Sequence, residues 1–436
     1  MLIEFSVGNF RSFRDVATLS LLTSKLKEND ELDNHNIFQE GKWSLLRSAA
    51  IFGANASGKS NFIRAFGYMR YLVLESATGL QAGQSTKVTR FALNPTAKEQ
   101  PAYFQIAFLI DGIQYRYGFE LDEQRVHAEW LYRTKQRESR LFVREGQNFD
   151  ISTTFRKEVR GLEELTRQNA LFLSVLAQFN SPTAGSLLSW FRNRVGVISG
   201  INDEHYLLYT LARVAEDDIF RQQMAMLLRL ADVGIHNVRV ESASLSDPAI
   251  PEHVRNFFEK IAEIDGEKAE DFLLRQAKMT HPVFQDGKRI DEMEFELEEE
   301  SAGTQKFFAL LGPILDTLEH GKVLVVDELE ARLHPLLTRE LVRLFNSAKT
   351  NPNRAQLIFA THDIDLLGEN LLRRDQVWFT EKNRYGETEL YSLAEMKERK
   401  DASYLKNYLL GRYGAIPYIN RFRAFIEQEL SDGAEA

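Results

Sequence analysis

The stretch IFGANASGKSNFIRAF, residues 51–66, decides the fold, because it joins a short apolar strand to an amphipathic helix through a glycine-rich turn. Eight of its residues match the pattern G-x-x-x-x-G-K-[S/T], in the strand-loop-helix context that a phosphate-binding P-loop requires. In such a loop, backbone N–H groups surround the phosphates, a lysine reaches the β- and γ-phosphates, and a hydroxyl binds Mg²⁺. The predicted nucleotide-binding residues are Gly53, Asn55, Ala56, Ser57, Gly58, Lys59, Ser60 and Asn61.

A second apolar run, residues 323–326, leads directly into two adjacent carboxylates, Asp327 and Glu328. At the end of a buried strand, the first carboxylate can hold Mg²⁺ while the second polarises an attacking water. Apolar strands often end in acids, so the pattern gains weight only from its place downstream of the P-loop. We predict Glu328 as a catalytic residue, and Ser60 with Asp327 as the metal ligands.

A third apolar run, residues 357–360, is followed by Thr361 and His362. A lone histidine is usually structural. At the end of the strand after the acidic pair, however, its ring could hydrogen-bond the γ-phosphate of a bound nucleotide. His362 is therefore the second predicted catalytic residue.

Small residues precede a long apolar helix that is expected to begin near Thr304. A helix N-terminus behind small residues can bind an anion, although simple N-capping by Ser301 or Thr304 would explain the same pattern. One chain has no evident way to direct this site and the P-loop at one phosphate. Pro313 in the middle of the helix predicts a kink or an early end. The candidate residues are Ser301, Gly303, Thr304 and Gln305.

The remainder of the chain changes periodicity several times. Alternation opens the chain and returns over residues 103–144, with Asp111-Gly112 as a hairpin turn. The periodicity is helical from about 155 to 278, and another hairpin is expected around Asp286-Gly287. Strands then alternate with helices over residues 304–363, which predicts an α/β protein with a parallel sheet.

Composition excludes several classes of site and of protein. The 436 residues include no cysteine, which rules out disulfides, thiolate zinc sites, iron–sulfur clusters and a cysteine nucleophile. No apolar run is long enough to span a bilayer, so we expect a cytoplasmic protein with no membrane partner. The net charge of -9 gives no general attraction to nucleic acid. A nucleic-acid partner stays open, because an acidic protein can still carry a basic groove.

The order of the motifs resembles a known group of proteins. The motifs are FRSF at residues 10–13, the P-loop, the S-x-G-T-Q segment at 301–305, VVDELEARLHP at 325–335 and ATHD at 360–363. Together they resemble the ABC-type ATPases of the RecF, SMC and overcoming-lysogenization-defect group. The chain is most similar to the RloA-like AAA-family ATPases of abortive infection and phage defence, and the similarity extends to NYLLGRYGAIP from residue 407.

The resemblance implies a role for each motif. Ser301 and Gly303 would contact the γ-phosphate of ATP bound to a second copy of the chain, so that two chains enclose two nucleotides with Mg²⁺. Glu328 would be the catalytic glutamate and His362 the switch histidine. Arg11 would lie near the nucleotide. The glutamine that usually links Mg²⁺ to the inserted lobe has no clear position in this sequence.

The expected fold class is α/β, namely an ABC/SMC-like split ATPase head with a β-rich lobe and a helical insertion. The expected domains are 1–95 for the N-terminal half of the head, 96–150 for the β-rich lobe, 151–280 for the helical insertion, 281–400 for the C-terminal half and 401–436 for a helical tail.

The sequence also departs from its relatives. The insertion lacks the long heptad tract of an SMC arm, and about 75 residues after His362 leave no room for the nuclease domain of the overcoming-lysogenization-defect proteins. The expected assembly is a homodimer, or a higher homo-oligomer built from dimers. Its expected partner is a separate effector protein such as a nuclease, which the chain would regulate as a sensor in anti-phage defence.

Two other functions stay open. The first is a RecF-like clamp that binds DNA in repair, and the second is a scaffold that binds ATP and hardly hydrolyses it. The basic segment 133–140 could follow a phosphate backbone, or it could be a solvated strand face paired with Glu129, Glu138 and Glu145. GTP is a further alternative to ATP, because P-loops bind phosphates and no base-reading residue is identifiable.

Overall fold

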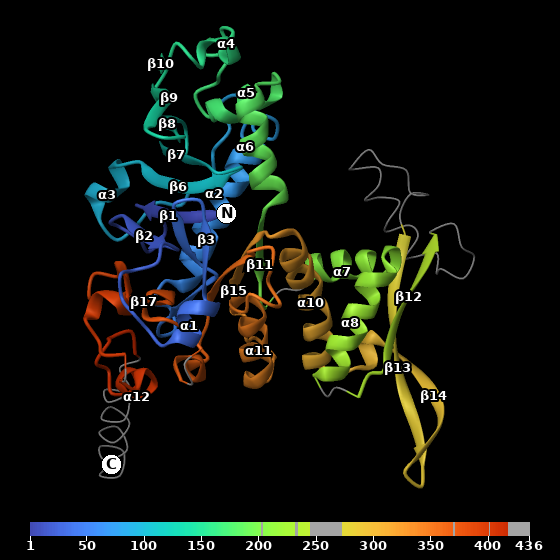
Figure 1. The fold of residues 1–436 in the computed structure, drawn as a ribbon. Coiled ribbons are helices and arrows are strands. Elements are labelled where there is room, and N and C mark those ends of the chain that lie inside the picture. Colours follow the sequence, from blue (N-terminus) through green and yellow to red (C-terminus); the bar gives the residue numbers. More distant parts are fainter. Residues whose placement is uncertain (202–203, 232–233, 245–272, 369–370, 401, 417–436) are drawn as a thin grey trace, which may run out of the picture. The chain divides into compact units, whose positions relative to one another are not determined.

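The computed structural model describes residues 1–201, 204–231, 234–244, 273–368, 371–400 and 402–416 (Figure 1). The chain divides into two compact units. The P-loop unit comprises Met1–Val197, His320–Leu329 and Arg339–Ala436. The signature unit comprises Ile198–Glu319 and Glu330–Thr338.

The P-loop unit contains a six-stranded sheet in which four neighbouring strands are parallel. Its order is β11 (Val195–Ser199), β15 (Val323–Asp327), β16 (Gln356–Ala360), β5 (Ser48–Phe52), β17 (Val377–Lys382) and β18 (Thr388–Ser392). Strand β5 comes from the first part of the sequence, yet its neighbours β16 and β17 come from the last. The predicted parallel sheet is confirmed, and both ends of the chain build it.

A seven-stranded antiparallel sheet forms the second layer of this unit. Its order is β10 (Asn148–Ile151), β9 (Glu138–Glu145), β8 (Val126–Thr134), β7 (Ile113–Leu121), β6 (Ala102–Ile110), β1 (Leu2–Gly8) and β2 (Ala17–Ser20). The hairpin turn predicted at Asp111-Gly112 is confirmed, with both residues at positive φ. Because β1 pairs with β6, the first strand of the chain shares one sheet with the strands of residues 102–151.

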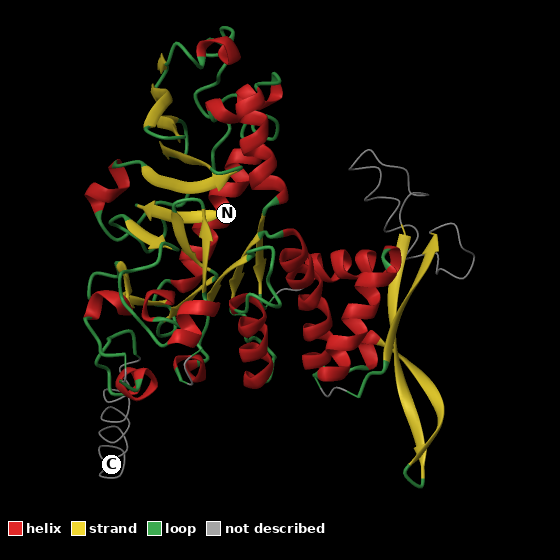
Figure 2. Cartoon of the chain, viewed as in Figure 1, coloured by secondary structure: helices red, strands yellow, loops and turns green. Residues whose placement is uncertain are grey.

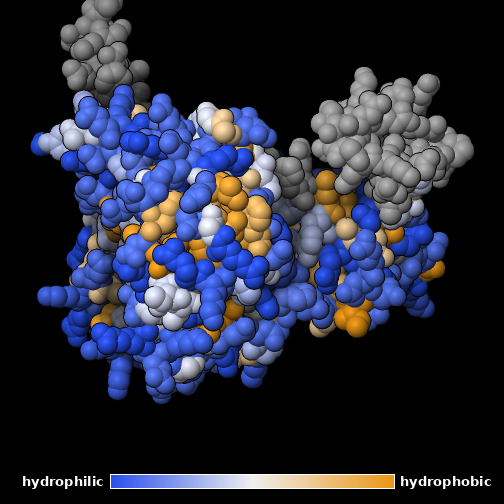
Figure 3. Space-filling model, turned by 90° about the horizontal axis from the view of Figure 1, so that it is seen from above, coloured by the Kyte–Doolittle hydropathy of each residue, from blue (hydrophilic) through white to orange (hydrophobic). Residues whose placement is uncertain are grey.

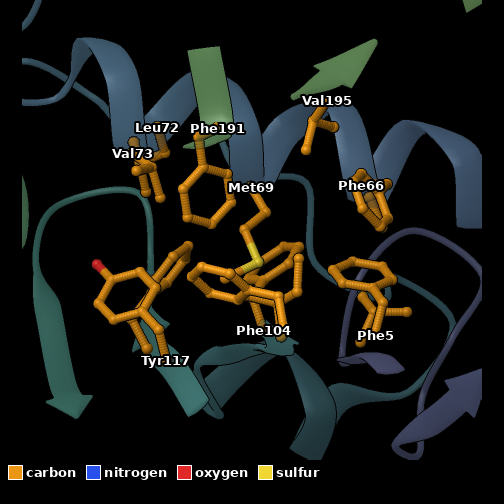
Figure 4. Close-up of a cluster of buried hydrophobic side chains, with 14 of the residues drawn as sticks. Phe5, Phe66, Met69, Leu72, Val73, Phe104, Tyr117, Phe191 and Val195 are labelled. Atoms are coloured by element: carbon orange, nitrogen blue, oxygen red, sulfur yellow. The ribbon is translucent and has the colours of Figure 1, made fainter. Parts of the chain in front are cut away.

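The main core lies around helix α2 (Lys59–Glu75), which follows the P-loop. On one side, Phe66 and Phe62 contact Phe5 of β1, with ring centroids 4.6 and 5.4 Å apart. Figure 4 shows Met69 of α2 pointing at Phe104 of β6. The same core includes buried side chains of β15 and β16. Helix α2 is thus anchored by both sheets, which fixes the loop at its N-terminus.

Further elements lie in this unit, except that α11 begins in the signature unit (Figure 2). They are α1 (Asp30–His35), β3 (Ile37–Glu40), β4 (Trp43–Leu46), α3 (Pro95–Glu99), α4 (Arg156–Val159), α5 (Phe172–Gln178), α6 (Pro182–Asn193), α11 (Pro335–Asn346), η3 (Ile364–Leu367), η4 (Arg374–Gln376), η5 (Leu393–Met396) and α12 (Tyr404–Leu409).

The signature unit combines helices with a three-stranded antiparallel sheet. Its elements are α7 (Glu204–Glu216), α8 (Asp218–Leu230), β12 (Asn237–Ser244), β13 (Leu273–Gln285), β14 (Lys288–Glu296), η2 (Leu297–Glu299) and α10 (Ala302–His320). The hairpin predicted around Asp286-Gly287 is confirmed.

The expectation of helical structure between about residues 155 and 278 is wrong at β11, at β12 and at the start of β13. At β12 and β13 the reason is a period of two that the longer helical pattern obscures. Ala277 and Met279 are buried while Lys278 between them is not, and Val238 is buried between the exposed Asn237 and Arg239.

The early end predicted for the helix at Pro313 does not occur, since α10 continues to His320. Proline cannot donate an N–H to the carbonyl four residues earlier. In this protein, the Thr210 hydroxyl of α7 lies 2.7 Å from that carbonyl oxygen, on Ala309, and 2.8 Å from the carbonyl oxygen of Tyr206, and it can donate its one proton to either. A side chain from another helix is therefore placed to supply the missing hydrogen bond.

None of the described helices is long and apolar enough to cross a membrane.

Candidate functional site

The P-loop connects β5 to α2 and curves through three residues at positive φ: Gly53, Ala56 and Gly58. The Lys59 side chain is buried, and its ammonium group donates to the carbonyl oxygens of Gly53 at 2.8 Å and Ala54 at 3.1 Å. The lysine thus connects the helix N-terminus to the beginning of the loop. This cradle at the start of a helix is suited to binding a polyphosphate.

Ser60 and Asp327 form a pair of oxygen donors beside this loop. The Ser60 hydroxyl donates to an Asp327 carboxylate oxygen at 3.0 Å. Burial raises the pKa of Asp327, the Ser60 hydrogen bond lowers it, and the neighbouring Glu328 raises it. Parallel strands bring their carboxyl ends to one edge of the sheet, so β15 delivers Asp327 to the loop that follows β5.

This donor set fits Mg²⁺. Mg²⁺ in nucleotide sites typically takes one or two protein oxygens, phosphate oxygens and waters. Within the described residues, no group of three or more His, Asp or Glu side chains could hold a metal without such help. Ser60 and Asp327 would hold the ion, and the ion would stabilise the negative charge on the phosphate oxygens during hydrolysis.

Glu328 follows β15 with φ at 56°. Left-handed backbone at a non-glycine residue costs about 1–3 kcal/mol and often occurs at functional sites. The next N–H, of Leu329, donates to the Ala360 carbonyl oxygen of β16 at 3.3 Å. The turn is thereby fixed at the end of the sheet where His362 follows β16.

His362 belongs to the same charge cluster. Burial lowers its pKa, as does the positive charge of Lys59, while Glu328 and Asp327 raise it. The lowered pKa favours the neutral ring at pH 7, and a neutral imidazole can donate to a phosphate oxygen through one nitrogen. The electrostatic coupling of these four residues indicates that the predicted catalytic and metal-binding residues of the P-loop unit lie together.

The FRSF turn also reaches the P-loop helix. Asn61 donates through its side-chain amide to the Ser12 hydroxyl at 2.8 Å. Arg11 is exposed, with φ at 52°, and its pKa is lowered first by partial burial and then by the nearby Arg64. The two guanidinium groups add positive charge near the loop, as a phosphate-binding site requires.

Sequence reasoning missed two threonines that brace the loop. The Thr388 hydroxyl donates to the Ser57 carbonyl oxygen at 2.8 Å and lies 2.9 Å from the Ser12 hydroxyl. A Cβ atom at Gly58 would lie 2.4 Å from the Thr388 hydroxyl, so only glycine fits there. The Thr380 hydroxyl lies 2.7 Å from that of Ser57. Both threonines are buried on β17 and β18, more than 300 positions from the loop, and no local pattern marks them.

Sequence reasoning also missed Arg64, which lies one helical turn beyond Ser60 on α2. Its positive charge lowers the pKa of Asp327 and that of Arg11. A basic residue four positions after the P-loop hydroxyl is the sequence signal that could have identified it.

The signature segment, residues 301–305, belongs to the other unit. The Ser301 hydroxyl accepts from the Thr304 N–H at 3.1 Å and lies 2.9 Å from the Thr304 hydroxyl. Gln305 donates to the carbonyl oxygens of Glu300 and Glu298. Ser301 therefore caps α10, as the plainer interpretation expects, and it stays exposed at the helix N-terminus together with Ala302. A capping serine and an exposed helix start leave this end accessible to an anion.

A cavity of about 620 Å³ adjoins the P-loop. On one side it is lined by residues 53–57 of the loop and on another by Thr361 and His362. Residues from the end of β17 and from the NYLLGRYGAIP segment complete it, among them Lys382 and Tyr408. The part of this motif up to Ile416 thus contributes a wall beside the loop.

The basic segment 133–140 and its surroundings form ion pairs on the surface. Arg140 pairs with Asp150, and Glu138 pairs with Arg116. Glu129, expected on the same face, is instead buried against Arg144. The visible surface in Figure 3 is mainly hydrophilic, with apolar areas between. These pairs match the solvated strand face better than a phosphate-binding surface.

Comparison with known proteins gives one matching family and several similar solved structures. Residues 48–368 match the family described as "AAA domain, putative AbiEii toxin, Type IV TA system". Curated protein sequences give no match.

Among solved structures, the SMC head domain from Thermotoga maritima aligns with 90% of this chain and 98% of its own, at 13% identity and a TM-score of 0.42. The SMC head bound to the C-winged helix domain of ScpA aligns with 91% and 99%, at 14% identity and a TM-score of 0.44. CbiO1 of the ABC transporter complex cbiONQ from Clostridium perfringens aligns with 95% and 98%, at 13% identity and a TM-score of 0.29.

Proposed function

We propose, on the premise that the chain belongs to this AAA domain family and is therefore an ATPase, that two copies of it close around ATP and that hydrolysis separates them. The match spans the P-loop, the signature segment, Asp327 with Glu328, and His362. ATP binding would favour the closed pair to the extent that the closed pair binds ATP more tightly than the open one.

The observation that carries the proposal is the hydrogen bond between Ser60 and Asp327. It joins two motifs that lie 267 positions apart in the sequence. Around it, Lys59 would bind the β- and γ-phosphates, and Ser60 with Asp327 would hold Mg²⁺. Glu328 would accept a proton from the attacking water, and His362 would hydrogen-bond the γ-phosphate.

The second anion site is the reason for proposing two copies. Ser301 is exposed directly before α10, and Gly303, Thr304 and Gln305 follow in the first turn of that helix, in a unit different from that of the P-loop. If the signature segment of one chain completes the nucleotide pocket at the P-loop of a second chain, both segments bind the same nucleotide in one symmetric assembly. A two-fold arrangement then encloses two nucleotides through the same pair of surfaces.

We further propose that this cycle regulates a separate effector protein in anti-phage defence. The description of the family names a putative toxin and a type IV toxin–antitoxin system. A switch that opens and closes with ATP suits the sensing partner of such a pair. The effector would be a toxic protein such as a nuclease.

The test measures ATP turnover and association state in wild type, Lys59→Ala and Glu328→Gln, each with Mg²⁺. Lys59→Ala should abolish turnover and ATP-dependent association, because the phosphates lose their buried cation. Glu328→Gln should lower kcat by about 10²–10⁴-fold while ATP still binds, because only the proton acceptor is lost.

Light scattering should then show that Glu328→Gln accumulates as a dimer when ATP is added. Equal turnover in wild type and Glu328→Gln would contradict the assigned role of Glu328 and favour an ATP-binding scaffold. The effector is tested with the protein encoded by the adjacent reading frame. The ATP-bound Glu328→Gln dimer and the Lys59→Ala variant, each immobilised, should retain different amounts of that protein.

A further inference from the structure

Helix α10, which begins directly after Ser301, lacks one of its own hydrogen bonds. Pro313 has no N–H, so the carbonyl oxygen of Ala309 has no donor four residues later. Both residues are buried, and a buried carbonyl without a partner is costly. Between Ala309 and Pro313, about two turns beyond the signature segment, the backbone of α10 therefore lacks its usual hydrogen bond.

Thr210 of α7 contacts the Ala309 carbonyl oxygen. Its hydroxyl lies 2.7 Å from the Ala309 carbonyl oxygen and 2.8 Å from that of Tyr206 in its own helix. Thr210 is fully buried. A Cβ atom at Gly312 would lie 1.9 Å from the Thr210 hydroxyl oxygen, so the glycine is what allows the two helices to approach this closely.

A second contact between the same helices lies nearer the signature segment. Lys306 is fully buried, directly after Gln305, and its ammonium group hydrogen-bonds the Tyr206 hydroxyl. The same ammonium group lies 4.8 Å from the centre of the Tyr206 ring. Tyr206 and Thr210 are one turn apart on α7, and they meet α10 at Lys306 and at the Ala309–Pro313 turn.

We propose that Thr210, assisted by Tyr206, is a positioning residue that holds the signature segment in the orientation that ATP hydrolysis needs. The proposal rests on the proposed function, in which Ser301 meets the phosphate of a second chain. It assigns a purpose to α7, which precedes the signature segment by about ninety positions and carries none of the family motifs.

The physical reason is local stiffness. A helix that lacks a backbone hydrogen bond at a proline bends there more readily than elsewhere. The donor from Thr210 and the close contact at Gly312 fix the relation of α10 to α7 at that point. Reacting groups must be held to within about 0.5 Å, so a small change in the direction of α10 would move Ser301 out of position.

The test compares Thr210→Val, which keeps the shape and loses the donor, with Thr210→Ser, which keeps the donor. Thr210→Val should lower kcat by about 10-fold or more, since an error of 1 Å can cost up to about 100-fold. Binding of a fluorescent ATP analogue to dilute protein should stay within about twofold of wild type, because the P-loop lies in the other unit. Thr210→Ser should retain most of the turnover.

Pro313→Ala provides the decisive control. It restores an N–H at residue 313, which can donate to the Ala309 carbonyl and make the Thr210 hydroxyl dispensable. We expect Thr210→Val with Pro313→Ala to match Pro313→Ala alone. This comparison also decides the matter if Thr210→Val alone fails to fold. The proposal would be overturned if Thr210→Val lowered turnover by the same factor in the Pro313→Ala background as in wild type. It would also be overturned if Thr210→Val alone kept wild-type turnover.

Ser301→Ala separates this inference from the proposed function. If Ser301→Ala lowers turnover and Thr210→Val does not, the positioning role fails and the two-copy ATPase stands. If Ser301→Ala leaves turnover unchanged while Lys59→Ala abolishes it, the role of the signature segment fails, and the positioning role falls with it.

Discussion

Thr388 acts on the nucleotide-binding loop although it lies far from it in the sequence. Its hydroxyl contacts the Ser57 carbonyl and the Ser12 hydroxyl, and its side chain fills the space left by Gly58. At this scale, the sequence predicts the residues of the P-loop because their pattern is local. It does not predict the brace, because a threonine on a strand has no distinguishing pattern until the fold brings it to the loop.

Thr388→Val should weaken ATP binding by about 10-fold, because a buried carbonyl on the loop loses a hydrogen bond worth about 1–2 kcal/mol. Titration with a fluorescent ATP analogue measures this. Thr388→Ser keeps the hydroxyl and should bind within about threefold of wild type. An unchanged dissociation constant for Thr388→Val would show that the loop holds its shape without the brace.

Glu328 marks the limit of prediction at the same scale. The sequence predicts that it follows a strand, and the structure adds that its backbone is left-handed, with φ at 56°. No propensity favours that conformation for glutamate. The next residue, Leu329, hydrogen-bonds β16, and this contact between elements is visible only in the fold.

At the scale of elements, a buried ion pair joins the antiparallel sheet to helix α5. Glu129 of β8 lies opposite Arg144 of β9, and both are fully buried. The Glu129 carboxylate accepts from the N–H groups of Phe172 and Leu173 at the start of α5, where Leu171 offers no side-chain cap. Burial raises the pKa of this carboxyl, and Arg144 opposes that rise.

The strands themselves were predictable from the alternation of apolar and polar residues. The buried ion pair between Glu129 and Arg144 was not. The expectation placed Glu129 on a solvated face beside the basic segment. Which face of a strand is buried depends on its partners in the sheet, and a charged residue on the buried face breaks the apolar pattern by which that face is recognised.

Arg144→Met should destabilise the protein by about 3–5 kcal/mol, because it leaves the Glu129 carboxylate buried without its cation. Urea unfolding followed by tryptophan fluorescence measures the change. Adding Glu129→Gln should recover part of the loss, since the remaining side chain is neutral. A single variant as stable as wild type would mean that the two backbone donors and the Tyr117 hydroxyl satisfy the carboxylate by themselves.

At the scale of the whole molecule, both ends of the chain build one parallel sheet. The order of motifs predicted that the P-loop and the strands that end at Asp327 and Ala360 share a sheet, and β5 beside β16 confirms it. The division into two units was not predictable from the sequence, since it depends on contacts between distant segments. It places the P-loop and the signature segment in different units.

The two-copy ATPase can be tested by mixing two variants, each of which changes one of these segments. Lys59→Ala keeps an intact signature segment, and Ser301→Ala keeps an intact P-loop, so each variant alone lacks one half of every site. A mixed dimer joins the good P-loop of one chain to the good signature of the other. One of the two sites in such a mixed dimer is complete and can still bind ATP, so mixing equal amounts should raise turnover clearly above the average of the two variants measured separately.

The control is dilution. Turnover per chain of wild type and of the mixture should both fall once the protein is diluted below the concentration at which the dimer forms, because the site then loses its second half. If each chain used its own signature segment, the mixture would show only the average of the two variants measured separately, at every concentration. That result would contradict a shared site while leaving the P-loop chemistry of each chain intact.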